Sequence, residues 1–333
     1  MTTPARPPAP VRADVALVER GLATSRTTAR RLIEAGRVRS GGAVVDRPSR
    51  PIGAEDPLDV APAPGGARDY VSRAALKLVG ALDALAATPL GAPSLAGRRV
   101  LDAGASTGGF TQVALERGAA HVVAVDVGHD QLAAVLRDDP RVTSLEGVNV
   151  RDLDPAQVAP APDVLVTDLS FISLTLVLAP LARALAPGAD AVVLVKPQFE
   201  VGRAALGKGG VVDDDGARAA ALARVLHAAG AAGFDVRAVL PSTVAGEHGN
   251  RELLAWLRLA DGPSSAAAPP VGTTGPAAAD CRLTEAAAAA AAGETVLLAS
   301  GEPGSPAASG DPLGALSTDL GPACRCRVGE WGT

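Results

Sequence analysis

Cysteine is nearly absent from this chain of 333 residues, which excludes several kinds of site. The three cysteines, Cys281, Cys324 and Cys326, all lie in the last 53 residues. An odd number of thiols at one end of a chain gives no disulfide framework. Cysteine nucleophiles and thiolate metal sites are therefore excluded from the first 280 residues, and we expect the protein to bind no metal.

Long apolar runs are missing as well. Hydrophobic residues make up 47% of the chain, enough for a sizeable core, yet no run of about 18 apolar residues is free of charges. The first residues, MTTPARPPAPVRADV, contain no apolar stretch of the secretory type. We therefore expect a cytoplasmic protein that does not span a membrane.

Lysine is scarce among the basic residues. Lys77, Lys196 and Lys208 are the three lysines, and the other 28 basic residues are arginines. A lysine can lose its proton when its surroundings lower its pKa, whereas a guanidinium is effectively always charged. The remaining lysines are thus candidates for chemistry that arginine cannot perform, with chance survival as the alternative.

Composition divides the chain into five segments. Residues 1–10 are rich in Pro and Ala and predict a disordered leader, and residues 61–69 form a Pro/Gly-rich linker. A compact unit at 11–60 lies between them. Residues 70–260 form the larger unit, and 261–333 a low-complexity tail. We expect this tail to be mostly disordered, with at most a transient helix in its alanine run.

The unit at 11–60 is basic within an acidic chain. Two helices, at 14–20 and 26–35, are predicted to precede short extended pieces, and Ser25 can cap the second helix. Residues 20–50 contain eight arginines against two acidic residues, whereas the whole chain carries a net charge of −5. Such a local charge indicates phosphate contacts, and a solvated surface is the alternative.

The larger unit alternates short apolar strands with helices. This pattern predicts βαβ units and a mostly parallel sheet covered on both faces, an α/β fold. Ligands of such sheets bind at the carboxyl ends of the strands. The expected strands are 98–103, 121–126, 141–146, 163–167, 190–195 and 234–240.

A glycine-rich turn follows the first of these strands, in RRVLDAGASTGGFT. Its spacing differs from the dinucleotide fingerprint, and it lacks the lysine of a phosphate-binding P-loop. Gly104, Gly108 and Gly109 let the backbone approach a ligand. Asp102 and Asp126 lie at the ends of the first two strands, where the second can accept hydrogen bonds from two ribose hydroxyls. This arrangement fits S-adenosylmethionine (SAM) better than a dinucleotide; a structural turn is the alternative.

Two further strands end in residues suited to acid–base chemistry. Asp168 follows DVLVT and Lys196 follows DAVVLV, so both are expected at the ligand edge. Burying a lysine is costly unless it is paired. Partial burial lowers a lysine pKa toward the range of a useful base. Lys77 lies in a helix before the sheet, and Glu252 follows the last predicted strand.

The order Lys77, Asp168, Lys196, Glu252 resembles the K-D-K-E tetrad of FtsJ-like ribose 2′-O-methyltransferases. Over roughly residues 12–259 the chain is more closely similar to the TlyA family of rRNA 2′-O-methyltransferases, also named hemolysin A. Its first part, 12–60, resembles an S4 RNA-binding domain. The matching blocks are YVSRAALKL, VLDAGASTGGFT, VDVGHDQL, TDLSFISL, VKPQFEVG and GNRELLAWL.

This resemblance implies a Rossmann-like SAM-dependent methyltransferase domain with a small α+β S4-like domain before it. It implies that Lys196 takes the 2′-hydroxyl proton, that Asp168 and Glu252 set its charge state, and that Lys77 orients the hydroxyl. Glu247 is the alternative to Glu252. The implied SAM contacts are Asp102, Gly104, Ser106, Gly108, Gly109, Phe110, Asp126, Asn149 and Val150, and the implied RNA contacts are Arg26, Arg30, Arg31, Arg37 and Arg39.

The leading prediction is a monomeric enzyme that methylates a ribose 2′-hydroxyl of rRNA, in isolated RNA or in ribosomal subunits. Cytidine as the target is implied by the resemblance. The alternatives are the same chemistry on another structured RNA, a membrane-active hemolysin-like protein, and an RNA-binding module with a decayed catalytic half. Phe171 and Phe199 follow the two catalytic strands. We favour core packing for them, with stacking on a displaced base as the alternative.

Overall fold

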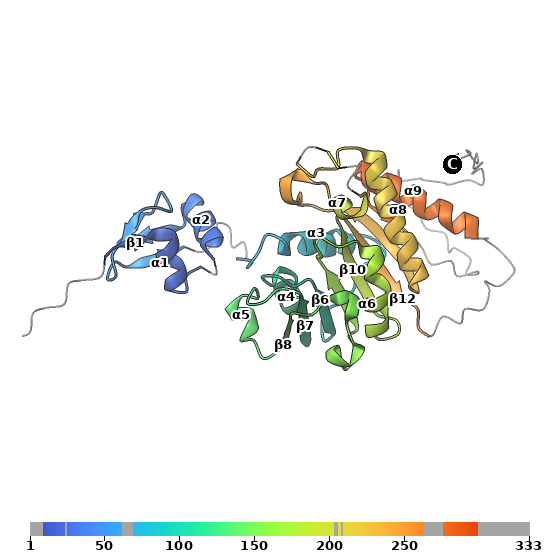
Figure 1. Ribbon diagram of the computed structural model, residues 1–333, viewed down its shortest axis with the longest axis horizontal. Helices are drawn as coiled ribbons and strands as arrows, with labels where there is room; N and C mark the ends of the chain where they lie inside the picture. Colours follow the sequence, from blue (N-terminus) through green and yellow to red (C-terminus); the bar gives the residue numbers. More distant parts are fainter. Residues whose placement is uncertain are drawn as a thin grey trace, which may run out of the picture. The chain divides into compact units, whose positions relative to one another are not determined.

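The computed structural model describes residues 9–23, 25–61, 69–202, 206–207, 209–262 and 276–298, and all structural statements below concern these residues (Figure 1). Most of the predicted leader, most of the linker, and residues 263–275 and 299–333 of the predicted tail lie outside them. Lys208 also lies outside them.

The N-terminal unit combines two helices with five short strands. Helix α2 begins where the sequence predicts, because the Ser25 hydroxyl accepts a hydrogen bond from the Thr28 amide at 3.1 Å. Leu17 and Ile33, from the two helices, pack with Val38 and Ile52 from the strands in a small core. The elements are β1 (Val11–Arg12), α1 (Ala13–Glu19), α2 (Arg26–Glu34), β2 (Val38–Ser40), β3 (Ala43–Val44), β4 (Pro51–Ile52) and β5 (Leu58–Val60).

An eight-stranded sheet forms the centre of the larger unit. Its order is β13-β11-β12-β10-β9-β6-β7-β8, and the five strands from β10 to β8 are parallel. This confirms the prediction of a mostly parallel sheet. The strands are β6 (Arg99–Ala103), β7 (His121–Asp126), β8 (Val142–Glu146), β9 (Val164–Thr167), β10 (Asp190–Val195), β11 (Phe234–Pro241), β12 (Leu253–Leu259) and β13 (Val296–Leu297).

Strand β12 was not predicted from the sequence. It lies between β10 and β11 and is antiparallel to both. Its run LLAWLRL is almost continuously apolar, a pattern that fits a buried strand and a buried helix equally well. Its insertion beside β10 fixes the position of Glu252, which directly precedes it.

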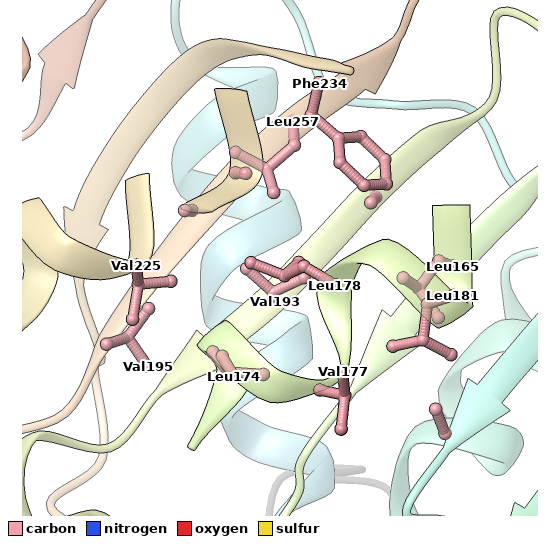
Figure 2. Close-up of a cluster of buried hydrophobic side chains, with 14 of the residues drawn as sticks. Leu165, Leu174, Val177, Leu178, Leu181, Val193, Val195, Val225, Phe234 and Leu257 are labelled. Carbon is pink, nitrogen blue, oxygen red and sulfur yellow. The ribbon is translucent and has the colours of Figure 1, made fainter. Parts of the chain in front are cut away.

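Helices cover both faces of the sheet, as predicted. Successive strand residues point to opposite faces, so Val192 packs with α3 and α4, and Val193 with α6 and α8. Figure 2 shows the second face, where Val193 and Val195 meet Leu178, Val225 and other apolar side chains. The helices are α3 (Ala75–Ala86), α4 (Gly109–Glu116), α5 (Ala134–Arg137), α6 (Leu178–Ala184), α7 (Pro197–Glu200), α8 (Asp215–Ala231) and α9 (Pro276–Ala292).

The structure differs from the expected disordered tail over residues 276–298. Helix α9 packs along α8 (Figure 1), and Ala286, Ala287 and Ala290 are buried in the core. Val296 of β13 pairs with Val239 of β11 at the sheet edge. Alanine has the highest helix propensity, and its small side chain lets two helices approach closely. The alanine run is therefore a packed part of the domain.

None of the helices in the described ranges has the length and apolar character needed to cross a bilayer.

Candidate active site

The carboxyl ends of the parallel strands create the ligand edge of this sheet. Strand β6 has β7 on one side and β9 on the other, so the strand order reverses at β6. In open α/β sheets, ligands bind outside the carboxyl ends of the strands at such a reversal. The residues that follow β6, β7, β9 and β10 are thus brought to one place.

The turn between β6 and α4 approaches the end of β9 closely. Gly104 has φ of 88°, and a Cβ there would lie 3.2 Å from the main-chain oxygen of Asp168. Gly108, with φ of 95°, precedes α4. L-residues with side chains rarely adopt such backbone angles, which explains the glycines. The turn presents bare backbone beside Asp168.

Asp126 is the last residue of β7, and its side chain stabilises this turn through a hydrogen bond. Its Oδ2 accepts a hydrogen bond from the Ser106 amide at 2.8 Å, and its Oδ1 accepts one from the Gly128 amide at 2.7 Å. The side chain is half-buried. Because each carboxylate oxygen has two acceptor sites, Asp126 retains capacity for further donors such as hydroxyl groups.

Asp102 lies beneath the turn, with no exposed surface. The Thr111 hydroxyl donates to its Oδ2 at 2.7 Å. Burial raises the pKa of Asp102 to about 7, and the nearby charges of Asp168 and Asp126 contribute in the same direction. Phe110 is also buried, at 2% exposure. Direct contact of these two residues with a cofactor stays a prediction.

Asn149 and Val150 follow β8, at the far side of the same edge. Asn149 is exposed, and its Oδ1 accepts a hydrogen bond from the Arg151 amide at 3.1 Å, which caps a short 3-10 helix at Val150–Asp152. Val150 is buried in the core. Of the two, Asn149 is therefore accessible to a ligand.

The predicted tetrad forms two ion pairs. Lys196 Nζ lies 2.6 Å from Asp168 Oδ1, and Lys77 Nζ lies 2.5 Å from Glu252 Oε2. Lys77, Lys196 and Glu252 are between 3% and 9% exposed. Buried charges of this kind need partners, and each lysine has one carboxylate. The sequence-based expectation differed, since it assigned both carboxylates to Lys196.

The register of β10 and β12 brings the two ion pairs together. Val195 pairs with Leu253 across these antiparallel strands. Lys196 is the next residue after Val195, and Glu252 directly precedes Leu253, so both lie just beyond the same end of the strand pair. The side chain of Glu247, the alternative to Glu252, lies outside the described part of the structure.

Ser170 is a contributor that the sequence analysis missed. Its Oγ accepts a hydrogen bond from Lys196 Nζ at 2.7 Å. Lys196 therefore forms an ion pair with Asp168 and donates a hydrogen bond to Ser170, two residues further along the chain after β9. The sequence did contain a signal for Ser170, because a hydroxyl two positions after a candidate carboxylate can reach the same partner.

Phe171 is 89% exposed, so the favoured expectation of core packing is wrong for this residue. Its φ of 63° is in the left-handed region, which few non-glycine residues adopt and which is enriched at functional sites. Its ring lies 5.2 Å from that of Phe199. Lys196 Nζ lies 5.9 Å from the centre of the Phe199 ring. The Phe199 ring thus lies beside Lys196, and the exposed Phe171 ring lies against Phe199.

The predicted RNA-binding arginines differ in their environments. Arg26 and Arg30 form ion pairs with Asp14, and Arg31 is exposed on α2. Arg39 is exposed and donates to the Gly42 carbonyl. Arg37 is largely covered, because it forms an ion pair of 2.6 Å with Asp69. Arg37 is therefore less available to phosphate than the sequence suggested.

Each of the two units of the chain matches a known family model. The model of the FtsJ-like methyltransferases matches residues 70–259, and that of the S4 domain matches residues 11–58. The 16S/23S rRNA (cytidine-2′-O)-methyltransferase TlyA of Mycobacterium tuberculosis is 49% identical over 247 residues, which are 74% of this chain and 89% of that protein. The chain belongs to the TlyA group of FtsJ-like methyltransferases.

Other members of this group carry different names. Hemolysin A of Brachyspira hyodysenteriae is 36% identical over 246 residues, 74% of this chain and 98% of that protein. A solved structure from Streptococcus thermophilus, named as a hemolysin candidate, is 37% identical with a TM-score of 0.60. The match covers 85% of this FtsJ-like chain and 96% of that one. These similarities confirm the predicted fold and family.

Proposed function

We propose that this protein transfers a methyl group from SAM to a ribose 2′-hydroxyl of rRNA, with cytidine as the target. The observation that carries the proposal is the two buried ion pairs, Lys196–Asp168 and Lys77–Glu252, the first of which adjoins the glycine turn through Asp168. The relatives from Mycobacterium tuberculosis and Campylobacter jejuni are named as rRNA (cytidine-2′-O)-methyltransferases, which supports the choice of substrate.

The residues at the ends of β6 and β7 fit SAM. Gly104 lets the turn after β6 pass close to the end of β9 at Asp168, and Asp126 offers a carboxylate for ribose hydroxyls. Exposed Asn149 lies after β8, where the adenine would reach. SAM, when bound, supplies a methyl group on a positively charged sulfur. The remaining contributions come from side chains of this chain.

Lys196 would act as the base in its neutral form. Its Nζ lone pair would accept the proton of the 2′-hydroxyl, which would leave that oxygen able to take the methyl group that bound SAM supplies. Asp168 and Ser170 hold Nζ in position and accept hydrogen bonds from the resulting ammonium. Lys77, held by Glu252, would orient the hydroxyl. Positioning of the 2′-hydroxyl is the main requirement of a direct methyl transfer.

Phe171 offers a stacking surface for the base of the target nucleotide. For the ribose to reach Lys196, the base of its nucleotide has to leave the stack in the RNA, and an exposed aromatic ring can replace the lost stacking contacts. Base–aromatic stacking contributes about 1–3 kcal/mol per base. Phe171→Ala is therefore expected to lower kcat/KM for RNA by roughly 5- to 150-fold.

Steady-state rates at fixed SAM and varied RNA measure this effect. Phe171→Tyr serves as the matched control, since it keeps the ring and should keep most of the activity. The affinity for SAM should be equal in all three proteins. An unchanged kcat/KM in Phe171→Ala would show that the exposed ring does not contact the substrate.

Purified protein, separate small and large ribosomal subunits, and SAM with a tritiated methyl group test the proposed function directly. After digestion of the RNA to nucleosides, the label is expected in 2′-O-methylcytidine. Label on a base, or no label in rRNA, would refute the proposal. A parallel reaction with bulk tRNA tests the alternative substrate, which would be favoured if tRNA were labelled and rRNA were not.

A further inference from the structure

One carboxylate in the N-terminal unit is covered by three arginines. Asp14, in the first turn of α1, has no exposed surface. Its carboxyl lies 2.9 Å from Nε of Arg12, 3.0 Å from Nη2 of Arg26 and 3.5 Å from Nε of Arg30. The three arginines come from β1 and from adjacent turns of α2. They converge on one point although they are spread over 19 residues of sequence.

The arginines face solvent on their other side. Their side chains are 45%, 56% and 53% exposed, in the order Arg12, Arg26 and Arg30. A guanidinium has five N–H donors, and the contacts with Asp14 use one or two of them on each arginine. Several donors on each arginine therefore remain for an outer acceptor, and a phosphate matches their fork geometry.

Asp14 is held firmly in its charged form. Its pKa is lowered to about 2, first by the hydrogen bond from Arg12 and also by that from Arg26. The carboxylate consequently persists at any pH at which RNA is bound.

We propose that Asp14 is a positioning residue for RNA binding: it holds Arg12, Arg26 and Arg30 together so that their outer donors form a preorganised phosphate site. The proposal rests on the proposed function, because it takes RNA as the ligand. Arginine side chains lose much rotamer freedom when they bind. A carboxylate that orders them beforehand reduces that loss.

An account based on charge alone and the positioning account predict opposite changes in RNA affinity when the Asp14 carboxylate is removed. Asp14 places a negative charge among three positive ones, so on charge alone its neutralisation should strengthen the attraction for phosphate. If Asp14 acts by positioning, Asp14→Asn frees the arginines and should weaken binding. The sign of the change therefore separates the two accounts.

The experiment measures binding of the full chain to rRNA over a series of salt concentrations, by fluorescence anisotropy. Asp14→Asn is expected to raise Kd about tenfold and to reduce the slope of log K against log salt by about one. The smaller slope reports a lost phosphate contact, which a general loss of stability would not produce. Asp46→Asn, at an exposed site in the same unit, is the matched control and should bind as tightly as wild type or slightly tighter.

A second variant keeps the test decisive if Asp14→Asn unfolds the unit, which thermal melting would reveal. Arg12→Lys conserves every charge but cannot form the two-point contact with Asp14 that Arg12 makes. Positioning predicts weaker RNA binding for Arg12→Lys, whereas charge alone predicts no change. Unchanged or tighter binding by a folded Asp14→Asn protein, or by Arg12→Lys, overturns the inference. Because Kd is measured without methyl transfer, failure of the proposed reaction in the wild type remains a separate result.

Discussion

Lys196→Arg is expected to reduce methyl transfer by about 10²- to 10⁴-fold, the contribution usual for a general base. The substitution keeps the positive charge that Asp168 and Ser170 contact. It removes the ability to become neutral, since a guanidinium holds its proton at all relevant pH values. Initial rates with labelled SAM and saturating rRNA measure the loss. The affinity for SAM, measured by calorimetry, should stay unchanged.

Lys208→Arg is the matched control for this change. It makes the same chemical substitution at the third lysine of the chain, which carries no role in the proposed mechanism. Its rate should equal that of the wild type. If Lys196→Arg retained more than a tenth of the activity, another group or water would have to remove the 2′-hydroxyl proton.

The location of the proposed catalytic residues could be predicted from the sequence because parallel strands impose it. Asp168 and Lys196 each follow a short apolar strand, and the carboxyl ends of such strands meet at one edge. The pairing could not be predicted in the same way. Glu252 reaches Lys77 because β12 runs antiparallel beside β10, and its apolar run did not identify it as a strand.

Composition predicted the wrong structure at two places where tertiary packing determines whether a residue is buried. The alanine-rich segment at 276–292 has few large apolar side chains, which favoured a prediction of disorder, yet close contact with α8 buries it. The prediction that Phe171 packs in the core was wrong for the opposite reason. An aromatic residue near apolar strands is usually buried, but Phe171 has a left-handed backbone and an exposed ring. Neither outcome follows from residue type.

Asp102→Asn is expected to change how stability depends on pH. The Asp102 pKa of about 7 in the folded protein lies above the ordinary value near 3.9 expected in the unfolded chain. Between these values the folded protein holds a proton that the unfolded chain has lost. The free energy of unfolding therefore falls as the pH rises through this range, by roughly 2.5 kcal/mol between pH 5 and pH 8 from this group. Asparagine cannot ionise, so the variant should lack this decrease.

Urea unfolding at pH 5 and pH 8 gives the change in the free energy of unfolding between the two pH values for each protein. The effect of Asp102 is the change in the wild type minus the change in Asp102→Asn. The amide can accept the hydrogen bond from Thr111, and any unsatisfied amide donor costs the same at both pH values, so it cancels. Asp235→Asn, at an exposed carboxyl on β11, should show almost no such difference. A parallel pH dependence of wild type and Asp102→Asn would mean that Asp102 is ionised at pH 5. Three carboxylates, Asp102, Asp126 and Asp168, would then repel one another at the ligand edge. A protonated Asp102 removes this repulsion, so that Asp168 keeps its charge for the ion pair with Lys196 and Asp126 keeps its charge for the proposed contact with ribose hydroxyls.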